Sequence, residues 1–228
     1  LYAYDTTPND TSIPNVLRQC IQLIAQFPSI AVYGYQAYRY YRNDQSLFLH
    51  QPDPSLSTAE NLLSLLRADQ KYTELEARIL DIALVLHAEH GGGNNSAFAC
   101  RVLTSSGTDP YSAYSASIGA LKGFRHGGAN IKVMEQLDNL KNKVKNPENE
   151  GEVADYLRKV LKREEGDGAG LVYGMGHAVY TLSDPRAVLL KERAFSLAKG
   201  KDIEKDFCLL DTIERLTPEL VAEKSAHA

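Results

Sequence analysis

The spacing of hydrophobic and polar residues along this chain is mainly that of α-helices. Residues 57–60 and 73–76 both have the S/T-x-x-E pattern of a capping box, in which side chains satisfy the first backbone N–H groups of a helix. Each box precedes an apolar run, the first at residues 62–66 and the second at residues 75–86. The second run is apolar on nearly every side, so we expect its helix to lie buried in the middle of a multi-helix core.

Two further helix starts are marked by an aspartate followed by a proline. Asp109 precedes Pro110 and Asp184 precedes Pro185, and each pair combines a capping side chain with a residue suited to the first helical position. Residues 111–123 are rich in Ser, Ala and Gly, which lets neighbouring helices approach closely. We therefore expect the helix after Pro110 to be central as well.

Two other segments complete the pattern. The aromatic residues within 32–41 suit either a strand or a helix, because periodicity alone does not separate the two, and the helical surroundings favour a helix. Residues 141–152 are almost wholly polar and predict a mobile connection or a solvated loop. The sequence therefore predicts an all-α fold, with a large helical core up to about Phe124 and a smaller helical region after it.

Composition narrows the class of protein. Of the 228 residues, 43% are hydrophobic and 24% are charged, which is typical of a globular protein. The formal net charge of -4 gives no reason to expect nucleic acid or an anionic membrane surface as a partner. No apolar run approaches the roughly 18 residues that a membrane-spanning helix needs, and the opening residues lack the pattern of a signal peptide.

The cysteines add information about the compartment. Cys20, Cys100 and Cys208 lie far apart and without CxxC spacing. Such a set argues against a disulfide framework or a zinc cluster and fits a reducing compartment. We therefore expect a cytoplasmic protein whose three thiols are buried as small hydrophobic groups.

Histidines and glycines gather in three short segments that could carry chemistry. His87 and His90 form H-A-E-H at the end of the second apolar run, and residues three apart share one face of a helix. The glycines that follow allow a backbone turn close to a ligand, and Asn94 supplies an amide group just beyond them.

The other two segments lie further along the chain. His126, in GFRHGGAN, would project from a tight turn at the start of a helix, where backbone N–H groups also point outward. His177 lies in VYGMGHAVY, and Arg186 stands at a helix start, where a guanidinium is suited to gripping a carboxylate. Taken singly, each histidine is explained as a helix cap and Arg186 as a surface ion pair. Their combination in one helical protein favours a functional site.

A metal site is one alternative. His87, His90 and His126 could bind a metal ion, but Glu89 is not placed as in H-E-x-x-H, and the pattern offers no carboxylate or cysteine to complete a ligand set. We therefore expect no metal.

The segments HAEHGGGNNSA, GALKGFRHGGAN and GMGHAVYTLSDPR resemble, in order and spacing, the three signature segments of citrate synthases. The segments SSGTDPYSAYSASIGALKG and PSLSTAENLLSLL look like this family as well, so the resemblance covers nearly the whole chain. It implies a multi-helix citrate-synthase-like fold and a homodimer built from helices of a large domain. Residues 1–127 would be part of that large helical domain, and residues 128–228 would form the small domain, incomplete at its C-terminal end.

The resemblance also implies an activity. Citrate synthases are acyltransferases of the tricarboxylic acid cycle that condense acetyl-CoA with oxaloacetate and water to citrate and CoA. His126 matches the histidine that hydrogen-bonds the thioester carbonyl and stabilises the enolate, and His177 matches the histidine that polarises the ketone of oxaloacetate. His90 and Arg186 match the side chains that hold the carboxylates of oxaloacetate.

Further residues are assigned by the same resemblance. Asn94 sits where the family has a supporting amide, and His87 would orient the cluster. The loop whose backbone wraps the adenine of CoA is matched by Val172, Tyr173, Gly174, Met175, Gly176 and Ala178. The expected partners are oxaloacetate and acetyl-CoA, the latter as a co-substrate, with no permanently bound cofactor.

The match is incomplete at the general base. In the family this base is an aspartate that, by spacing, would follow residue 228, whereas Asp202, Asp206 and Asp211 lie on what the pattern predicts to be a polar helix face. Thr181 stands where many relatives carry a basic residue that contacts CoA phosphate. We expect the 228-residue chain by itself to be impaired, because loss of a general base costs about 10²–10⁴-fold in rate.

Two alternatives within the resemblance stay open. The 2-methylcitrate synthases, which use propionyl-CoA, share these motifs. The second alternative is a non-catalytic remnant of the family that binds CoA or a dicarboxylate without turnover.

Overall fold

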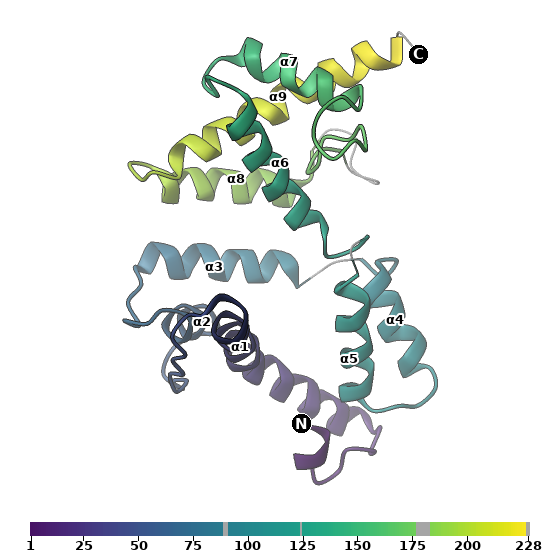
Figure 1. Ribbon diagram of the computed structural model, residues 1–228. Coiled ribbons are helices and arrows are strands. Elements are labelled where there is room, and N and C mark those ends of the chain that lie inside the picture. Colours follow the sequence, from purple (N-terminus) through teal and green to yellow (C-terminus); the bar gives the residue numbers. More distant parts are fainter. Residues whose placement is uncertain (89–90, 124, 177–182, 227–228) are drawn as a thin grey trace. The chain divides into compact units, whose positions relative to one another are not determined.

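The computed structural model describes residues 1–88, 91–123, 125–176 and 183–226, and within these ranges the regular secondary structure is entirely helical (Figure 1). The predicted all-α class is confirmed. The chain divides into two compact units, Leu1–Leu121 (unit 1) and Lys122–Ala228 (unit 2), and each is described by itself. The assignment of residues 1–127 and 128–228 to two functional domains stays a prediction.

The described part of unit 1 contains a short 3-10 helix and five α-helices. In chain order they are η1 (Tyr2–Tyr4), α1 (Ile13–Asn43), α2 (Thr58–Leu66), α3 (Glu74–His87), α4 (Asn95–Thr104) and α5 (Pro110–Leu121). The aromatic residues at 32–41 belong to α1, so the choice of helix over strand is confirmed. The Nε2 of Gln36, on the buried side of α1, donates to the carbonyl oxygen of Leu66 at 3.0 Å and ties α1 to the end of α2.

Both predicted capping boxes are present. The backbone N–H of Ser57 donates to Glu60 at 2.8 Å, and the backbone N–H of Glu60 donates to the Ser57 hydroxyl at 3.3 Å. Thr73 and Glu76 exchange the same pair of bonds at 2.8 and 3.2 Å. These side chains explain why α2 and α3 begin where they do.

The burial predicted for α3 is wrong in this chain. Ala77 is the one residue of α3 that is buried, whereas Leu75 is 44% and Val85 is 65% exposed. Helix α3 packs against α2. The apolar surface of α3 is wider than the side that α2 covers, so the other apolar residues of this helix are half-buried or exposed.

Helix α5 packs closely against α4 and also contacts α1, as its small residues predict. Ala113 and Ser117 lie on the buried side of α5, whereas Tyr114, Ile118 and Leu121 are 44–52% exposed. The central position expected for this helix therefore holds for one of its faces.

The described part of unit 2 contains four α-helices, whose buried apolar side chains form a shared core. The helices are α6 (Ala129–Lys143), α7 (Glu150–Leu161), α8 (Pro185–Ala198) and α9 (Glu204–Ala226). The core contains Leu137 and Leu140 from α6, Leu157 from α7, and Leu209 and Ile213 from α9.

The sequence predicts one continuous loop at residues 141–152, and the structure shows that this prediction is wrong. The segment holds the last turn of α6, a short connection and the first turn of α7. Val144 in the connection is buried in the core, and the Asn149 side chain accepts from the N–H groups of Gly151 and Glu152 to cap α7. The polar composition therefore reflects two helix ends, where capping and charged residues are favoured.

Two sequence-based expectations concern membrane-spanning helices and the cysteines. Among the described helices, none is both long and apolar enough to cross a membrane. Cys208 is exposed, whereas Cys20 and Cys100 are half-buried. The expectation of three buried thiols is thus wrong for Cys208, because α9 turns the next residue, Leu209, into the core, and Cys20 and Cys100 are only partly covered.

The ion pair at the start of α3 makes unit 1 sensitive to acid. The Arg67 guanidinium donates to both carboxylate oxygens of Glu76 at 3.1 and 2.9 Å, and with the backbone N–H of Thr73 it lowers the pKa of Glu76 from 4.5 to about 2. The stabilisation is therefore complete above about pH 4.5 and is lost as the pH falls toward about 2.

We expect Glu76→Gln to lower stability by about 1 kcal/mol at pH 7, allowing for solvent screening of the partly exposed guanidinium. The glutamine keeps an acceptor for the capping box, so the loss reports the charge. Thermal unfolding followed by circular dichroism from pH 7 to 2 should show a flatter pH dependence in the variant. Glu74→Gln removes the same charge from the same helix turn and serves as the control. Parallel pH profiles of Glu76→Gln and the wild type would contradict the prediction.

Candidate active site

The turn that carries His126 lies immediately before α6. The backbone N–H groups of His126 and Gly127 both donate to the carbonyl oxygen of Gly123, at 2.9 and 3.1 Å. Gly128 is the N-terminal cap residue of α6, and His126 is half-buried. The structure thus confirms the predicted tight turn before a helix, and this turn fixes where the imidazole leaves the backbone.

Residues 172–176 form a loop that is anchored by two apolar side chains. Val172 is 8% exposed and belongs to the core of unit 2, and Met175 packs against the same core. Gly174 and Gly176 both have a φ of +82°, a conformation in which a side chain is strained. Because the two apolar side chains pack inward, the two exposed glycines present their backbone to solvent.

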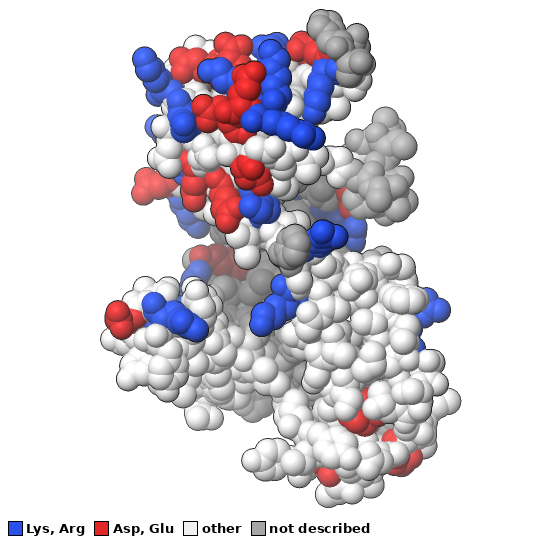
Figure 2. Space-filling model, turned by 45° about the vertical axis from the view of Figure 1, so that its right-hand side comes forward, with Lys and Arg blue, Asp and Glu red and all other residues white. Residues whose placement is uncertain are grey.

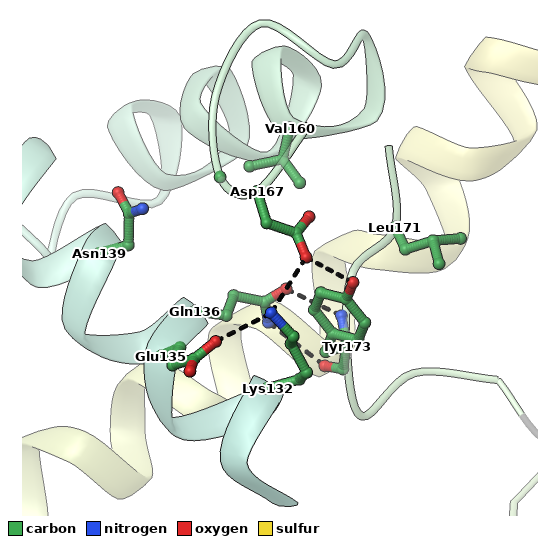
Figure 3. A pocket seen from close by; sticks show the side chains of 9 residues that line it. Lys132, Glu135, Gln136, Asn139, Val160, Asp167, Leu171 and Tyr173 are labelled. Atoms are coloured by element: carbon green, nitrogen blue, oxygen red, sulfur yellow. Dashed lines mark hydrogen bonds and ion pairs between the residues drawn. The ribbon is translucent and has the colours of Figure 1, made fainter. Parts of the chain in front are cut away.

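Gln136 of α6 holds this loop through the backbone of Tyr173 (Figure 3). The Gln136 Oε1 accepts from the Tyr173 N–H at 2.8 Å, and the Gln136 Nε2 donates to the Tyr173 carbonyl oxygen at 3.2 Å. Gln136 is 9% exposed, so both bonds are largely shielded from water. We call this pair of bonds the amide clamp.

A second contact from α6 reaches the next residue of the loop. A Cβ on Gly174 would lie 3.1 Å from the Val133 Cγ2, which is closer than an ordinary van der Waals contact. Helix α6 therefore touches the loop at two successive residues, through the amide clamp and through Val133.

A charged cluster holds the Tyr173 ring beside a cavity of about 100 Å³ (Figure 3). The Tyr173 hydroxyl donates to the Asp167 Oδ2 at 2.7 Å, and the Lys132 Nζ lies 3.4 Å from the same oxygen and 3.0 Å from the Glu135 Oε2. The Tyr173 hydroxyl, and then the Ala169 N–H, lower the pKa of Asp167 and so keep its carboxylate ionised. The cluster orients the ring without using the amide clamp.

Arg186 is paired at the start of its own helix. The Asp184 Oδ1 accepts from the backbone N–H of Arg186 at 2.9 Å and caps α8, as the sequence predicts. The guanidinium donates to the same carboxylate through Nε at 3.1 Å and Nη2 at 2.7 Å. Asp184 thus preorients the guanidinium, and a bound dicarboxylate would share or displace this pair. A role for Arg186 in binding oxaloacetate stays a prediction.

In unit 1, His87 and Asn94 both serve helix ends. His87 is exposed in the last turn of α3, and its Nδ1 lies 2.6 Å from the Ala83 carbonyl oxygen, which requires that Nδ1 donate. The Asn94 Oδ1 accepts from the N–H and the hydroxyl of Ser96, at 3.1 and 2.8 Å, and caps α4. These are the structural roles that each residue type plays most often at a helix end.

His90, His177 and Ala178 lie outside the described residues, as do Glu89 and Thr181. His87 and Asn94 belong to unit 1, whereas His126, Arg186 and the loop belong to unit 2. Because each unit is described by itself, their meeting in one cleft stays a prediction. Within the described ranges, no group of His, Cys, Asp or Glu side chains is arranged to hold a metal ion.

The aspartates near the end of the chain have structural partners. Asp206 accepts from the Lys141 Nζ at 2.8 Å, and Asp211 pairs with Lys191 on the surface of α9. Asp206 and Asp211 thus lie on a helix as predicted, whereas Asp202 lies in the turn before α9 begins at Glu204, so the prediction of a polar helix face is wrong for Asp202.

Sequence analysis missed Gln136. A signal was present, because the positions of Val133, Leu137, Leu140 and Val144 form one apolar stripe along and just beyond α6, and Gln136 interrupts it. A polar side chain on a core-facing stripe needs a partner, although the sequence does not say which.

Comparison with known families assigns the whole chain to one of them. The family model "Citrate synthase, C-terminal domain" matches residues 1–228. The chain belongs to the citrate synthase family. The resemblance drawn from the sequence motifs is thereby confirmed.

Relatives in the citrate synthase family are similar along most of this chain. The citrate synthase of Haloferax volcanii is 35% identical over 185 residues, which is 81% of this chain, and that of Acidithiobacillus ferridurans is 33% identical over 211 residues, or 91%. The solved citrate synthase from Thermotoga maritima MSB8 matches with a TM-score of 0.68 at 28% identity and covers 95% of this chain. The chain spans about half the length of these relatives, namely 44%, 49% and 52%.

The contact between Val133 and Gly174 generates a stability prediction. Gly174→Ala would combine strain at a φ of +82° with a methyl group 3.1 Å from Val133, whereas Gly200→Ala combines a similar φ of +74° with open space. A left-handed conformation costs a non-glycine residue about 1 kcal/mol or more, so both variants should unfold at lower urea concentration. Gly174→Ala should lower the free energy of unfolding more than Gly200→Ala does. Equal losses of stability in the two variants would contradict the prediction, because the loop would then relax away from α6.

Proposed function

We propose that this citrate synthase family chain serves the condensation of oxaloacetate with acetyl-CoA and water to give citrate and CoA. These substrates are the ones implied by the resemblance of the sequence motifs to citrate synthases. Acetyl-CoA would act as a co-substrate, and no permanently bound cofactor is expected. A cytoplasmic location and a place in the tricarboxylic acid cycle belong to the same proposal.

The chemistry asks for a donor at the thioester oxygen. A thioester methyl group is a very weak acid, so its proton leaves only if the developing enolate oxygen is met by a placed hydrogen-bond donor. His126 would supply that donor, and His177 would polarise the ketone that the enolate carbon attacks. Asn94, His90, His87 and Arg186 would hold and orient oxaloacetate.

What supports the proposal most is the arrangement at the start of α6. The turn of His126 leads directly into this helix, and the same helix holds residues 172–176 through Gln136 and Val133. One rigid element therefore carries both the residue proposed to act on the thioester and the support for the loop proposed to bind CoA. Val172, Tyr173, Gly174, Met175, Gly176 and Ala178 are the proposed CoA-binding residues.

The test is thiol release by the protein that carries this sequence, purified at its full natural length. With oxaloacetate and acetyl-CoA we expect free CoA thiol and citrate, the product being confirmed by mass spectrometry. Faster turnover of propionyl-CoA would instead indicate a 2-methylcitrate synthase. Tight binding of CoA or oxaloacetate without turnover of either thioester would indicate a binding protein and would contradict the proposed activity.

His126→Ala tests the proposed catalytic group. Removing one donor to a developing oxyanion typically costs about 10²–10³ in kcat, and we expect a loss of that size with oxaloacetate binding largely retained. His50→Gln alters another half-buried histidine, whose Nε2 contacts the Arg67 carbonyl oxygen, and serves as the control. Equal activity of His126→Ala and the control would remove His126 from the mechanism.

We propose a homodimer as the assembled form. Tyr114, Ile118 and Leu121 recur at helical spacing on the exposed face of α5, and Phe98 and Val102 do the same on α4, which packs beside it. On the face seen in Figure 2, unit 1 carries few charged side chains, whereas unit 2 carries many, with Lys and Arg mixed among Asp and Glu. An apolar face of this kind is typical of a protein interface.

A charge on α5 should break such a dimer. We expect the wild-type protein to have the mass of a dimer by size-exclusion chromatography with light scattering, and Ile118→Glu to shift it to the monomer, because an unpaired carboxylate in an apolar interface is costly. Gln51→Glu adds the same charge in an exposed loop and should leave the dimer intact. A dimeric Ile118→Glu would exclude this face of α5 from the interface.

A further inference from the structure

We propose that Gln136 is a positioning residue that sets the backbone of residues 172–176 for the nucleotide end of CoA. This inference rests on the function proposed above. It assigns to Gln136 the fixing of the loop backbone in one direction, which the glycine-rich loop does not achieve by itself.

The amide clamp holds the two peptide groups on either side of the Tyr173 Cα, one through its N–H and the other through its carbonyl oxygen. A carboxamide has the same donor and acceptor as a peptide unit, so Gln136 pairs with the N–H and the carbonyl of Tyr173 as a neighbouring strand would. Two bonds to one residue fix the orientation of its backbone as well as its position.

The loop needs such a support. Gly174 and Gly176 follow Tyr173, and glycines lose more backbone freedom on ordering than any other residue. Ligand binding to a loop that is already ordered avoids that cost. With Val172 buried on one side and the amide clamp on the next residue, the backbone enters Gly174 in a set direction.

The clamp is itself anchored in the core. Leu137 follows Gln136 in α6 and is 4% exposed, and Leu140 one turn later is fully buried. The backbone of α6 that carries Gln136 is therefore held by the core. Because the side chain is 9% exposed, removing its donor and acceptor would leave the Tyr173 peptide group with poor access to water in its place.

Gln136→Met keeps the length and volume of the side chain and removes the clamp, which makes it the sharpest test. We expect the KM for acetyl-CoA to rise about five- to tenfold, the loss of one or two neutral hydrogen bonds. The kcat and the KM for oxaloacetate should stay within about twofold, since the variant leaves His126 and Arg186 untouched. Asn139→Leu changes an amide on the next turn of α6 that lines the same cavity, and it should alter none of these constants.

A second measurement follows the clamp without any substrate. In the wild-type protein the backbone N–H of Tyr173 should exchange slowly with deuterium, and in Gln136→Met it should exchange at least about tenfold faster. Faster exchange with an unchanged KM for acetyl-CoA would overturn the proposal. An equal loss in all kinetic constants together with a lowered Tm would also overturn it, because Gln136 would then be a purely structural residue.

Failure of the proposed function can be told apart from failure of the role proposed for Gln136. If the wild-type protein releases no thiol from acetyl-CoA or propionyl-CoA, that function is wrong, and calorimetric titration with CoA then decides the role of Gln136. Weaker CoA binding by Gln136→Met than by Asn139→Leu would support the positioning role. Equal binding by the two variants, or no binding of CoA by the wild type, would overturn it.

Discussion

The apolar contact where α6, α7 and α9 meet is the interaction on which the candidate site depends. Leu140, Leu157 and Ile213 come from these three helices, and each is 0% exposed. Full burial of one such side chain contributes about 1.5–3 kcal/mol, and large-to-small changes at such positions leave cavities that cost more. Val172 joins the same cluster, so the loop begins inside the core. The core therefore fixes the direction of α6 and the origin of the loop together.

Unit 1 is held together in a different way. Asp5 accepts hydrogen bonds from the hydroxyl of Tyr111 at 2.6 Å, from Arg18 at 2.8 Å and from Gln19 at 3.1 Å, which ties the N-terminal segment to α1 and α5. The Tyr111 hydroxyl is the largest cause that holds the pKa of Asp5 far below its usual range. Polar bonds of this kind hold the N-terminal segment while large apolar side chains such as Ile118 stay exposed. Both units also carry ion pairs, such as Arg67–Glu76 in unit 1 and Lys141–Asp206 in unit 2. The apolar faces of unit 1 thus suit burial against another surface.

The sequence predicts local structure well and packing less well. Capping boxes and Asp-Pro pairs act within four residues, so the starts of α2, α3, α5 and α8 follow from short-range chemistry alone. The burial of α3 depends on which helices lie beside it, and its composition does not contain that information. The site divides in the same way: the glycines around His126 mark its turn, whereas the contact between Gln136 and Tyr173 joins residues 37 apart.

Recognition of a ligand by backbone, as proposed for residues 172–176, would explain why such a contact escapes a motif search. Where a ligand meets peptide groups, the side chains of the loop are free to vary, and a signature retains only the glycines that allow the backbone path. The path itself is then set by residues that need not touch the ligand: Val172 in the core, Val133 against Gly174, and the carboxamide of Gln136. If residues 172–176 bind CoA as proposed, the affinity of this protein for CoA would depend on α6 through Gln136 and Val133, two residues that carry no catalytic chemistry.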